Sequence, residues 1–218
     1  MVVLEGLDGV GKSTQVALLA AWLEGADVPY LVVREPGGTP LGEAIRELVL
    51  TRSDLDVGPA SELLLMLAAR AALVRDVLRP ALGEGKLVIA DRFSLSTLAY
   101  QAHGRGLDPE RVRSAIEVAT GGLRPDVCVV LDLPLEEAAG RRKAAAGRPD
   151  RIEREGEAFR RKVRDAYLAL AETEPGVELL DARGTPEEVH ARIRDLIAAR
   201  LPVHVQAVSR EGVDRDGA

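Results

Sequence analysis

The 218-residue sequence contains one cysteine, Cys128, and no apolar stretch long enough to span a membrane. A single cysteine cannot form an internal disulfide. Because Cys128 lies in the apolar run DVCVVLDL, we expect it to be a small buried core residue and not a nucleophile. A membrane-spanning helix needs about 20 consecutive apolar residues, so the sequence predicts no such helix.

The sequence also has no excess of positive charge. Its 29 Lys and Arg residues are outnumbered by 35 Asp and Glu residues, and the formal net charge is -6. Nucleic acids and anionic membrane surfaces are bound by basic fields, so we expect neither as a partner, although a local basic pocket is compatible with this balance. The first residues read as a strand, without a basic leader or a small-residue cleavage site, which favours a cytoplasmic protein.

Short apolar runs rich in β-branched residues recur along the chain and alternate with longer stretches of helical spacing. The runs are MVVLE, PYLVVRE, KLVIADR, DVCVVLDL and GVELLDA. The helical stretches begin after Lys12 and cover residues 59–82, 110–120, 159–170 and a last segment that opens with TPEE. In TPEE, Thr185 and Glu188 have the spacing of a capping box. This alternation predicts an α/β fold with a parallel sheet covered by helices on both faces.

Two stretches depart from this alternation. AAGRRKAAAGRPDRIERE, residues 138–155, is charged and rich in alanine, and Gly147 and Pro149 interrupt it. The tail over residues 202–218 has no helical periodicity, and we expect it to be disordered.

The stretch LEGLDGVGKST has the phosphate-loop pattern G-x-x-x-x-G-K-[ST] between an expected strand and an expected helix. Glycines let successive backbone N–H groups point inward, and the helix start adds the positive end of its dipole. Lys12 supplies a point charge for the β- and γ-phosphates, and Ser13 offers a hydroxyl to Mg²⁺. The residues expected to bind a nucleoside triphosphate are Gly6, Leu7, Asp8, Gly9, Val10, Gly11, Lys12, Ser13 and Thr14.

Asp8 is unusual in this loop because a carboxylate raises the cost of holding phosphate unless it faces elsewhere. It can accept a hydrogen bond from a hydroxyl of a second substrate, or hold a metal-bound water. A solvent-facing loop aspartate is the alternative interpretation.

Three further stretches each carry an arginine at or near the end of an expected element: REPGGTPLGEAIR, MLAAR and ADRFSLSTLAYQ. Pro36 forces Glu35 into an extended conformation, and a cis bond between them is possible. Asp91 and Arg92 close an expected strand at the edge where open parallel sheets bind ligands. Together these arginines indicate a site in which guanidinium groups bind a monophosphate, although each one alone is compatible with a surface ion pair.

The sequence resembles the thymidylate kinase family through EGLDGVGKST, REPGGTPLGEAIR, DRFSLSTLAYQ, GRGLD and PDRIE, which occur in family order. The resemblance covers about residues 2–201 and implies one domain over 1–201: a P-loop fold with a five-stranded parallel sheet and a lid at about 140–153. It implies phosphorylation of dTMP with ATP and Mg²⁺. It also implies a homodimer, for which the long apolar helix over 59–82 offers one face.

The resemblance further implies roles for particular residues. Arg46 and Arg92 would hold the dTMP phosphate, and Arg70 would reach the thymine carbonyl. Asp91 would lie near Mg²⁺, together with Ser13, and near the transferring phosphoryl group. The full set implied for dTMP is Asp8, Glu35, Pro36, Arg46, Met66, Arg70, Arg92, Thr97, Tyr100 and Gln101. The set implied for catalysis is Lys12, Asp91, Arg92, Arg148 and Arg151.

Two positions depart from the family pattern. Met66 stands where a phenylalanine usually stacks on thymine, although a thioether also contacts a ring face favourably. Gly9 stands where one subclass has a loop arginine, so the charge of the transition state would be met by the basic stretch. Its candidates are Arg141, Arg142, Lys143, Arg148 and Arg151.

Two other functions stay open at this point. Another deoxynucleotide or nucleoside kinase would share the phosphate loop, but a nucleoside kinase would need a base for a neutral hydroxyl and no arginines for a monophosphate. A GTP-dependent switch or binding module would need a guanine-reading N-K-x-D segment as well as a D-x-x-G switch, and the sequence contains no N-K-x-D segment.

Overall fold

The structure is a computed structural model that describes residues 1–52, 54–144 and 150–201. The strands are β1 (Val2–Glu5), β2 (Tyr30–Arg34), β3 (Leu87–Asp91), β4 (Val127–Asp132) and β5 (Val177–Asp181). They form one five-stranded parallel sheet in the order β2-β3-β1-β4-β5. This confirms the predicted strands and fold class. The expectations for Arg148 and for the tail over 202–218 concern positions outside the described residues.

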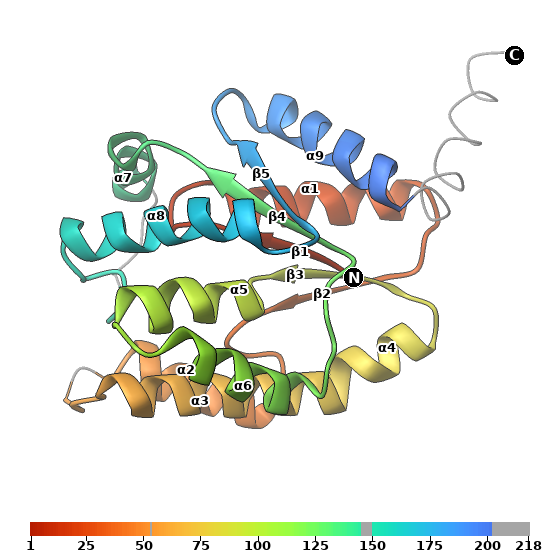
Figure 1. Ribbon diagram of the computed structural model, residues 1–218. Helices are drawn as coiled ribbons and strands as arrows, with labels where there is room; N and C mark the ends of the chain where they lie inside the picture. The colour runs from red at the N-terminus through yellow and green to blue at the C-terminus, as the bar shows by residue number, and fades with distance from the viewer. Residues whose placement is uncertain (53, 145–149, 202–218) are drawn as a thin grey trace, which may run out of the picture.

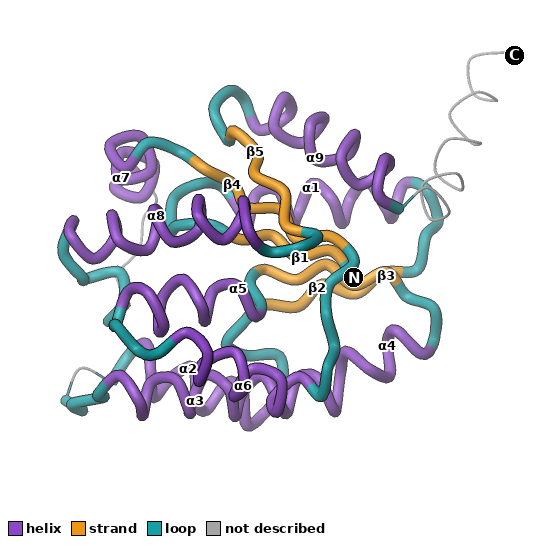
Figure 2. The backbone as a smooth tube through the Cα atoms, viewed as in Figure 1, coloured by secondary structure: helices purple, strands orange, loops and turns teal. Residues whose placement is uncertain are grey.

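Helices connect the strands and cover both faces of the sheet (Figure 1). They are α1 (Lys12–Gly25), α2 (Pro40–Leu50), α3 (Pro59–Leu73), α4 (Arg79–Gly83), α5 (Ser94–Thr97), α6 (Pro109–Thr120), α7 (Leu135–Ala144), α8 (Glu157–Thr173) and α9 (Pro186–Arg200). The π-helical segments η1 (Val74–Leu78) and η2 (Leu98–Gly104) continue α3 and α5. α1 and α9 lie together on one face, and α8 and η2 pack on the other (Figure 2). Within the described ranges, no helix has both the length and the apolar character needed to cross a membrane.

The three central strands are buried along almost their whole length, which explains why they read as continuous apolar runs. Cys128 lies in β4 and is buried, as expected. The two edge strands expose alternate side chains such as Val32 and Leu179. The core therefore lies around β1, β3 and β4 and holds their carboxyl ends in fixed register.

The first part of the charged stretch is helical and belongs to α7, which ends at Ala144. Its apolar spacing is weak in the sequence, since only a narrow face, with Ala138 buried, packs on the domain. The expected capping box of α9 is confirmed: the Glu188 amide donates to Thr185 Oγ1 at 3.2 Å, and the Thr185 amide donates to Glu188 Oε2 at 2.8 Å.

Gly6 makes the turn that leads from β1 into the phosphate loop. Its φ of +127° lies in a region that side chains with a Cβ rarely adopt. A Cβ at this position would also overlap the backbone carbonyl of Leu131, at the end of β4. Only glycine therefore lets the loop leave the sheet so close to β4.

We expect Gly6→Ala to lower the free energy of unfolding by about 2 kcal/mol or more, because backbone strain and a clash with rigid backbone add together. The measurement is urea denaturation followed by circular dichroism. Gly83→Ala is the matched control, since nothing lies within 4 Å of a Cβ built on this helical glycine. The control should keep or slightly raise stability. Equal stability of the two variants would contradict this account of the turn.

Candidate active site

A cleft of about 750 Å³ opens at the carboxyl ends of the strands, where the phosphate loop, the turn after β2 and the end of β3 meet. Its lining includes Asp8 to Thr14 of the loop, but not Gly6 and Leu7. It also includes every residue predicted for the acceptor: Asp8, Glu35, Pro36, Arg46, Met66, Arg70, Arg92, Thr97, Tyr100 and Gln101. Two sets of residues predicted for two anions therefore share one cleft.

The phosphate loop turns its lysine inward. Lys12 Nζ donates to the carbonyl oxygens of Gly6 at 3.1 Å and Leu7 at 2.9 Å, and lies 3.7 Å from Asp8. Burial, and then the charge of Arg92, lower the pKa of Lys12, while Asp8 opposes the shift. Gly9 and Gly11 both have positive φ, so their backbone follows the curl that an anion-binding loop requires.

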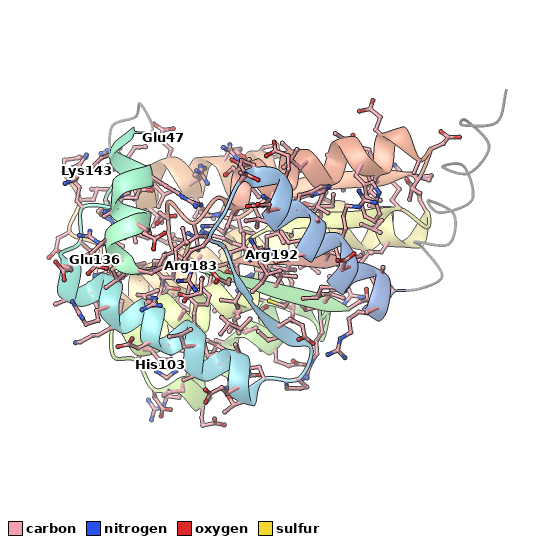
Figure 3. The ribbon with its side chains drawn as sticks, turned by 90° about the horizontal axis from the view of Figure 1, so that it is seen from above. Glu47, His103, Glu136, Lys143, Arg183 and Arg192 are labelled. Atoms are coloured by element: carbon pink, nitrogen blue, oxygen red, sulfur yellow. The ribbon has the colours of Figure 1, made fainter. Side chains whose placement is uncertain are left out.

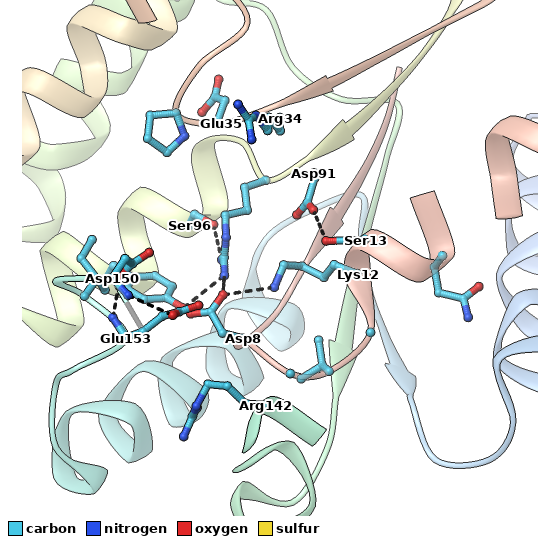
Figure 4. Close-up of a pocket in the computed structure, with 18 of the residues that line it drawn as sticks. Asp8, Lys12, Ser13, Arg34, Glu35, Asp91, Ser96, Arg142, Asp150 and Glu153 are labelled. Carbon is cyan, nitrogen blue, oxygen red and sulfur yellow. Dashed lines mark hydrogen bonds and ion pairs between the residues drawn. The ribbon is translucent and has the colours of Figure 1, made fainter. Parts of the chain in front are cut away.

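Ser13 and Asp91 provide oxygen atoms beside this loop. Ser13 Oγ donates to Asp91 Oδ2 at 3.1 Å, across the gap between α1 and the end of β3 (Figure 4). No group of three or more His, Cys, Asp or Glu residues that could hold a metal is found among the described residues. This donor set fits Mg²⁺ bound with a nucleotide, which takes one or two protein oxygens and completes its shell with phosphate and water.

Asp8 forms an ion pair with Arg92 at the junction of the two halves of the cleft. Arg92 Nη2 donates to Asp8 Oδ1 at 2.5 Å. Burial raises the pKa of the Asp8 carboxyl, but Arg92 and Lys12 outweigh it and lower this pKa to about 2. Asp8 is thus a charged group that faces the site, and not a solvent-facing loop residue.

Arg92 is held by a buried polar network that the sequence did not reveal. Its Nη1 donates to Ser96 Oγ at 3.1 Å and to Tyr167 OH at 3.2 Å. Both of those hydroxyls contact Glu5, which is fully buried and also accepts from the Phe93 amide at 2.8 Å. Arg92 itself has a φ of +76°, so the chain turns sharply at the end of β3 and directs this guanidinium into the cleft.

The acceptor end of the cleft contains a second buried ion pair. Arg70 donates to Glu35 through Nε at 2.8 Å and Nη2 at 2.5 Å, and through Nη1 to Thr97 Oγ1 at 2.8 Å. Both side chains are almost completely buried. The Glu35–Pro36 bond is cis, and the Pro36 carbonyl accepts from Arg46 Nη1 at 2.9 Å. The turn after β2 therefore orients two of the predicted arginines.

The predicted residues of the basic stretch differ in their location and contacts. Arg141 and Arg142, both on α7, line the cleft, and Arg141 lies over the loop near Gly11. Lys143 is exposed, at the opposite end of α7 from Glu136 (Figure 3). Arg151 donates to Glu62 Oε2 at 2.5 Å and to the Val49 carbonyl at 2.8 Å. The catalytic role of Arg151 stays a prediction, and its present contacts are with α3 and α2.

The cleft also has lining residues that the sequence patterns did not predict: Gln15, Arg34, Leu50, Ser96, Asp150, Ile152, Glu153, Gly184, Pro186 and Val189. Asp150 and Glu153 belong to PDRIE, so this motif was the available signal. Burial raises the pKa of Glu153, and the neighbouring Asp150 and Asp8 charges add to the shift. Gly184 and Pro186 come from the start of α9, where the sequence showed only a helix cap.

A phosphate loop at the first strand-to-helix turn of this parallel sheet, with arginines facing it across one cleft, defines a P-loop nucleotide-binding protein of the α/β class. The family model described as thymidylate kinase matches residues 4–193. The chain belongs to the thymidylate kinase family.

Relatives and a solved structure agree with this assignment. A thymidylate kinase of Chlorobium chlorochromatii is 46% identical over 216 residues, which cover 94% of this chain and 97% of the relative. One from Pseudomonas syringae pv. tomato is 47% identical over 201 residues, covering 92% and 95%. The crystal structure of thymidylate kinase from Ehrlichia chaffeensis matches with a TM-score of 0.70 and 29% identity, covering 90% of this chain and 97% of that one.

We expect Asp8→Asn to lower the free energy of unfolding at pH 6 by about 1–2 kcal/mol, after allowance for partial exposure of the carboxylate. The folded-state pKa of about 2 lies below the ordinary 3.8. The stabilisation is therefore complete above about pH 4 and is lost as the pH falls towards 2.

The measurement is urea denaturation of wild type and variant at pH 6, 4.5 and 3. The difference in the free energy of unfolding between wild type and Asp8→Asn should be smallest at pH 3. Asp56→Asn, which changes an exposed loop carboxylate, serves as the control. A difference that stays constant over this range would rule out the ion pair as its source.

Proposed function

We propose that this protein transfers the γ-phosphoryl group of ATP to the phosphate of dTMP, which yields dTDP and ADP. The observation that carries the proposal is the single cleft in which the phosphate loop and the arginines Arg46 and Arg92 lie together. A protein that only binds a triphosphate has no need for a second set of cationic groups facing it. The relatives described above are named thymidylate kinases, which supports dTMP as the acceptor.

Phosphoryl transfer requires positioning and charge compensation more than covalent chemistry. The loop from Gly6 to Ser13 holds the triphosphate, and Lys12 lies beside its β- and γ-phosphates. Arg46 and Arg92 hold the acceptor phosphate in line with the γ-phosphorus. That phosphate is largely dianionic near neutral pH, so no strong general base is needed.

Ser13 and Asp91 are the residues that we propose to hold Mg²⁺. Bound there with ATP, Mg²⁺ would neutralise part of the negative charge of the transferring phosphate group. Asp8 keeps Arg92 directed at the space between the two substrates. Arg70, held by Glu35 and Thr97, offers a donor to the base, and Met66 lies against the same end of the cleft.

We also propose that residues 1–201 act as one domain, with a lid at about 140–153, in a homodimer in the cytoplasm. The exposed apolar side chains of Leu64 on α3 and Val118 on α6 support a dimer face there, because these two helices pack side by side. Light scattering at several concentrations measures the oligomeric state.

We expect dTMP to be phosphorylated with a kcat/KM far above those of dCMP and dGMP, with dUMP a poorer acceptor than dTMP. A site built to pair with polar groups of one base can reject another by ~10⁴. A coupled ADP-release assay with ATP, Mg²⁺ and each monophosphate measures this. A chelator should abolish activity, and thymidine should be inactive. Equal turnover of dTMP and dCMP, or preference for thymidine, would refute the acceptor assignment.

We expect Arg148→Ala to lower kcat by ~10³–10⁵, by analogy with arginine fingers that neutralise the transferring phosphoryl group. Arg151→Ala should lose turnover together with thermal stability, because Arg151 also neutralises the buried Glu62. Lys143→Ala is the matched control, since Lys143 is an exposed cation of the same stretch. Steady-state kinetics measure kcat, and melting curves measure the stability, of the three variants. Normal turnover of Arg148→Ala would contradict a catalytic role for Arg148.

A further inference from the structure

Glu62 is a buried carboxylate that stands directly behind the acceptor end of the cleft. It lies on α3 and is only 1% exposed. Gln101 Nε2 donates to its Oε1 at 2.9 Å, and Arg105 donates to both oxygens at 3.1 Å. Arg151 Nη2 also donates to Glu62 Oε2, at 2.5 Å. One carboxylate thus joins a residue that lines the cleft to two cations from other parts of the chain.

The charge of Glu62 decides the orientation of the Gln101 amide. Burial raises the pKa of Glu62, but hydrogen bonds from Arg105, Gln101 and Arg151 outweigh it, so the pKa is lowered and the group is a carboxylate. A carboxylate accepts hydrogen bonds and cannot donate them. The NH₂ end of Gln101 must therefore face Glu62. Because Gln101 also lines the cleft, its carbonyl oxygen is the end left to face the ligand.

The neighbouring Arg70 is a hydrogen-bond donor, whereas the carbonyl oxygen of Gln101 is an acceptor. Glu35 and Thr97 fix its guanidinium, which can only donate. The base end of the cleft therefore presents a fixed donor beside a fixed acceptor. Thymine carries a carbonyl oxygen at C4, which can accept from the donor, and an N–H at N3, which can donate to the acceptor. Cytosine has an amino group and a bare ring nitrogen at the same places, so it would set donor against donor and acceptor against acceptor.

We propose that Glu62 is a positioning residue for base selection: by fixing the amide of Gln101 with its oxygen towards the cleft, it makes the site accept a thymine-like edge and reject a cytosine-like edge. This rests on the proposed acceptor, dTMP. Glu62 acts through Gln101 and has no contact with the reacting phosphates.

The test is Glu62→Gln, which keeps the shape but provides a side chain that can either donate or accept. Gln101 can then turn over. We expect the dTMP:dCMP ratio of kcat/KM to fall at least ~10-fold, mainly through a higher KM for dTMP and a lower KM for dCMP. A merely structural defect would lower both activities together and leave the ratio unchanged.

Arg105→Gln is the matched control. It removes an ion pair of the same carboxylate but leaves the bond from Gln101 to Glu62 in place. Melting curves should show a loss of stability comparable to that of Glu62→Gln, while the dTMP:dCMP ratio should stay within about twofold of wild type. If both variants change the ratio equally, the proposal fails.

The double variant Glu62→Gln with Gln101→Glu, which exchanges the two side chains, tests the same proposal if the single variant does not fold. It restores one amide and one carboxylate, now with the acceptor-only group at the cleft. We expect it to regain preference for dTMP, and loss of that preference would overturn the proposal. Wild type is assayed first, so a failure to phosphorylate dTMP at all would count against the proposed function and not against Glu62.

Discussion

Repulsion between two phosphate groups brought within reaction distance is the constraint on which this site depends. Fixed positive charge must stand between them before either binds. We propose that Arg92 supplies this charge at the end of β3, where an ion pair of 2.5 Å with Asp8 holds the guanidinium beside the phosphate loop. The parallel sheet makes this possible, because adjacent strands β1 and β3 end at the same edge. Strand order therefore brings the loop and the arginine close together, and the turn at Arg92 directs its side chain towards the loop.

Three of the groups predicted to bind substrate are oriented by a buried carboxylate. Glu5 holds the hydroxyls that contact Arg92, Glu35 holds Arg70, and Glu62 holds Gln101. A buried ion pair gives little net stability, since both charges lose their hydration. Its value here is preorganisation: the donors and acceptors already stand in place, so substrate binding does not have to order long flexible side chains.

Local patterns explain which parts of the site the sequence could predict. The phosphate loop and the five strands depend on short stretches, and each left a readable signal at Gly6, Lys12 and the apolar runs. Glu5 and Glu62 left none, because their partners lie tens of positions away along the chain. The helix α7 left only a weak signal for a different reason, since half of its residues are charged and few are large and apolar. The sequence thus predicted residues that line the cleft more readily than the residues that orient them.

In the proposed reaction, the ion pairs would also limit how tightly the substrates bind before transfer. An acceptor phosphate bound to Arg92 would share this guanidinium with Asp8, which weakens the attraction between arginine and phosphate. The same ion pair holds the guanidinium in one position. Catalysis gains only from interactions that are stronger in the transition state than in the ground state. If Lys12 and Arg92 act as proposed, their fixed positions would favour the transition state, in which the negative charge has spread towards the loop, over the bound substrates.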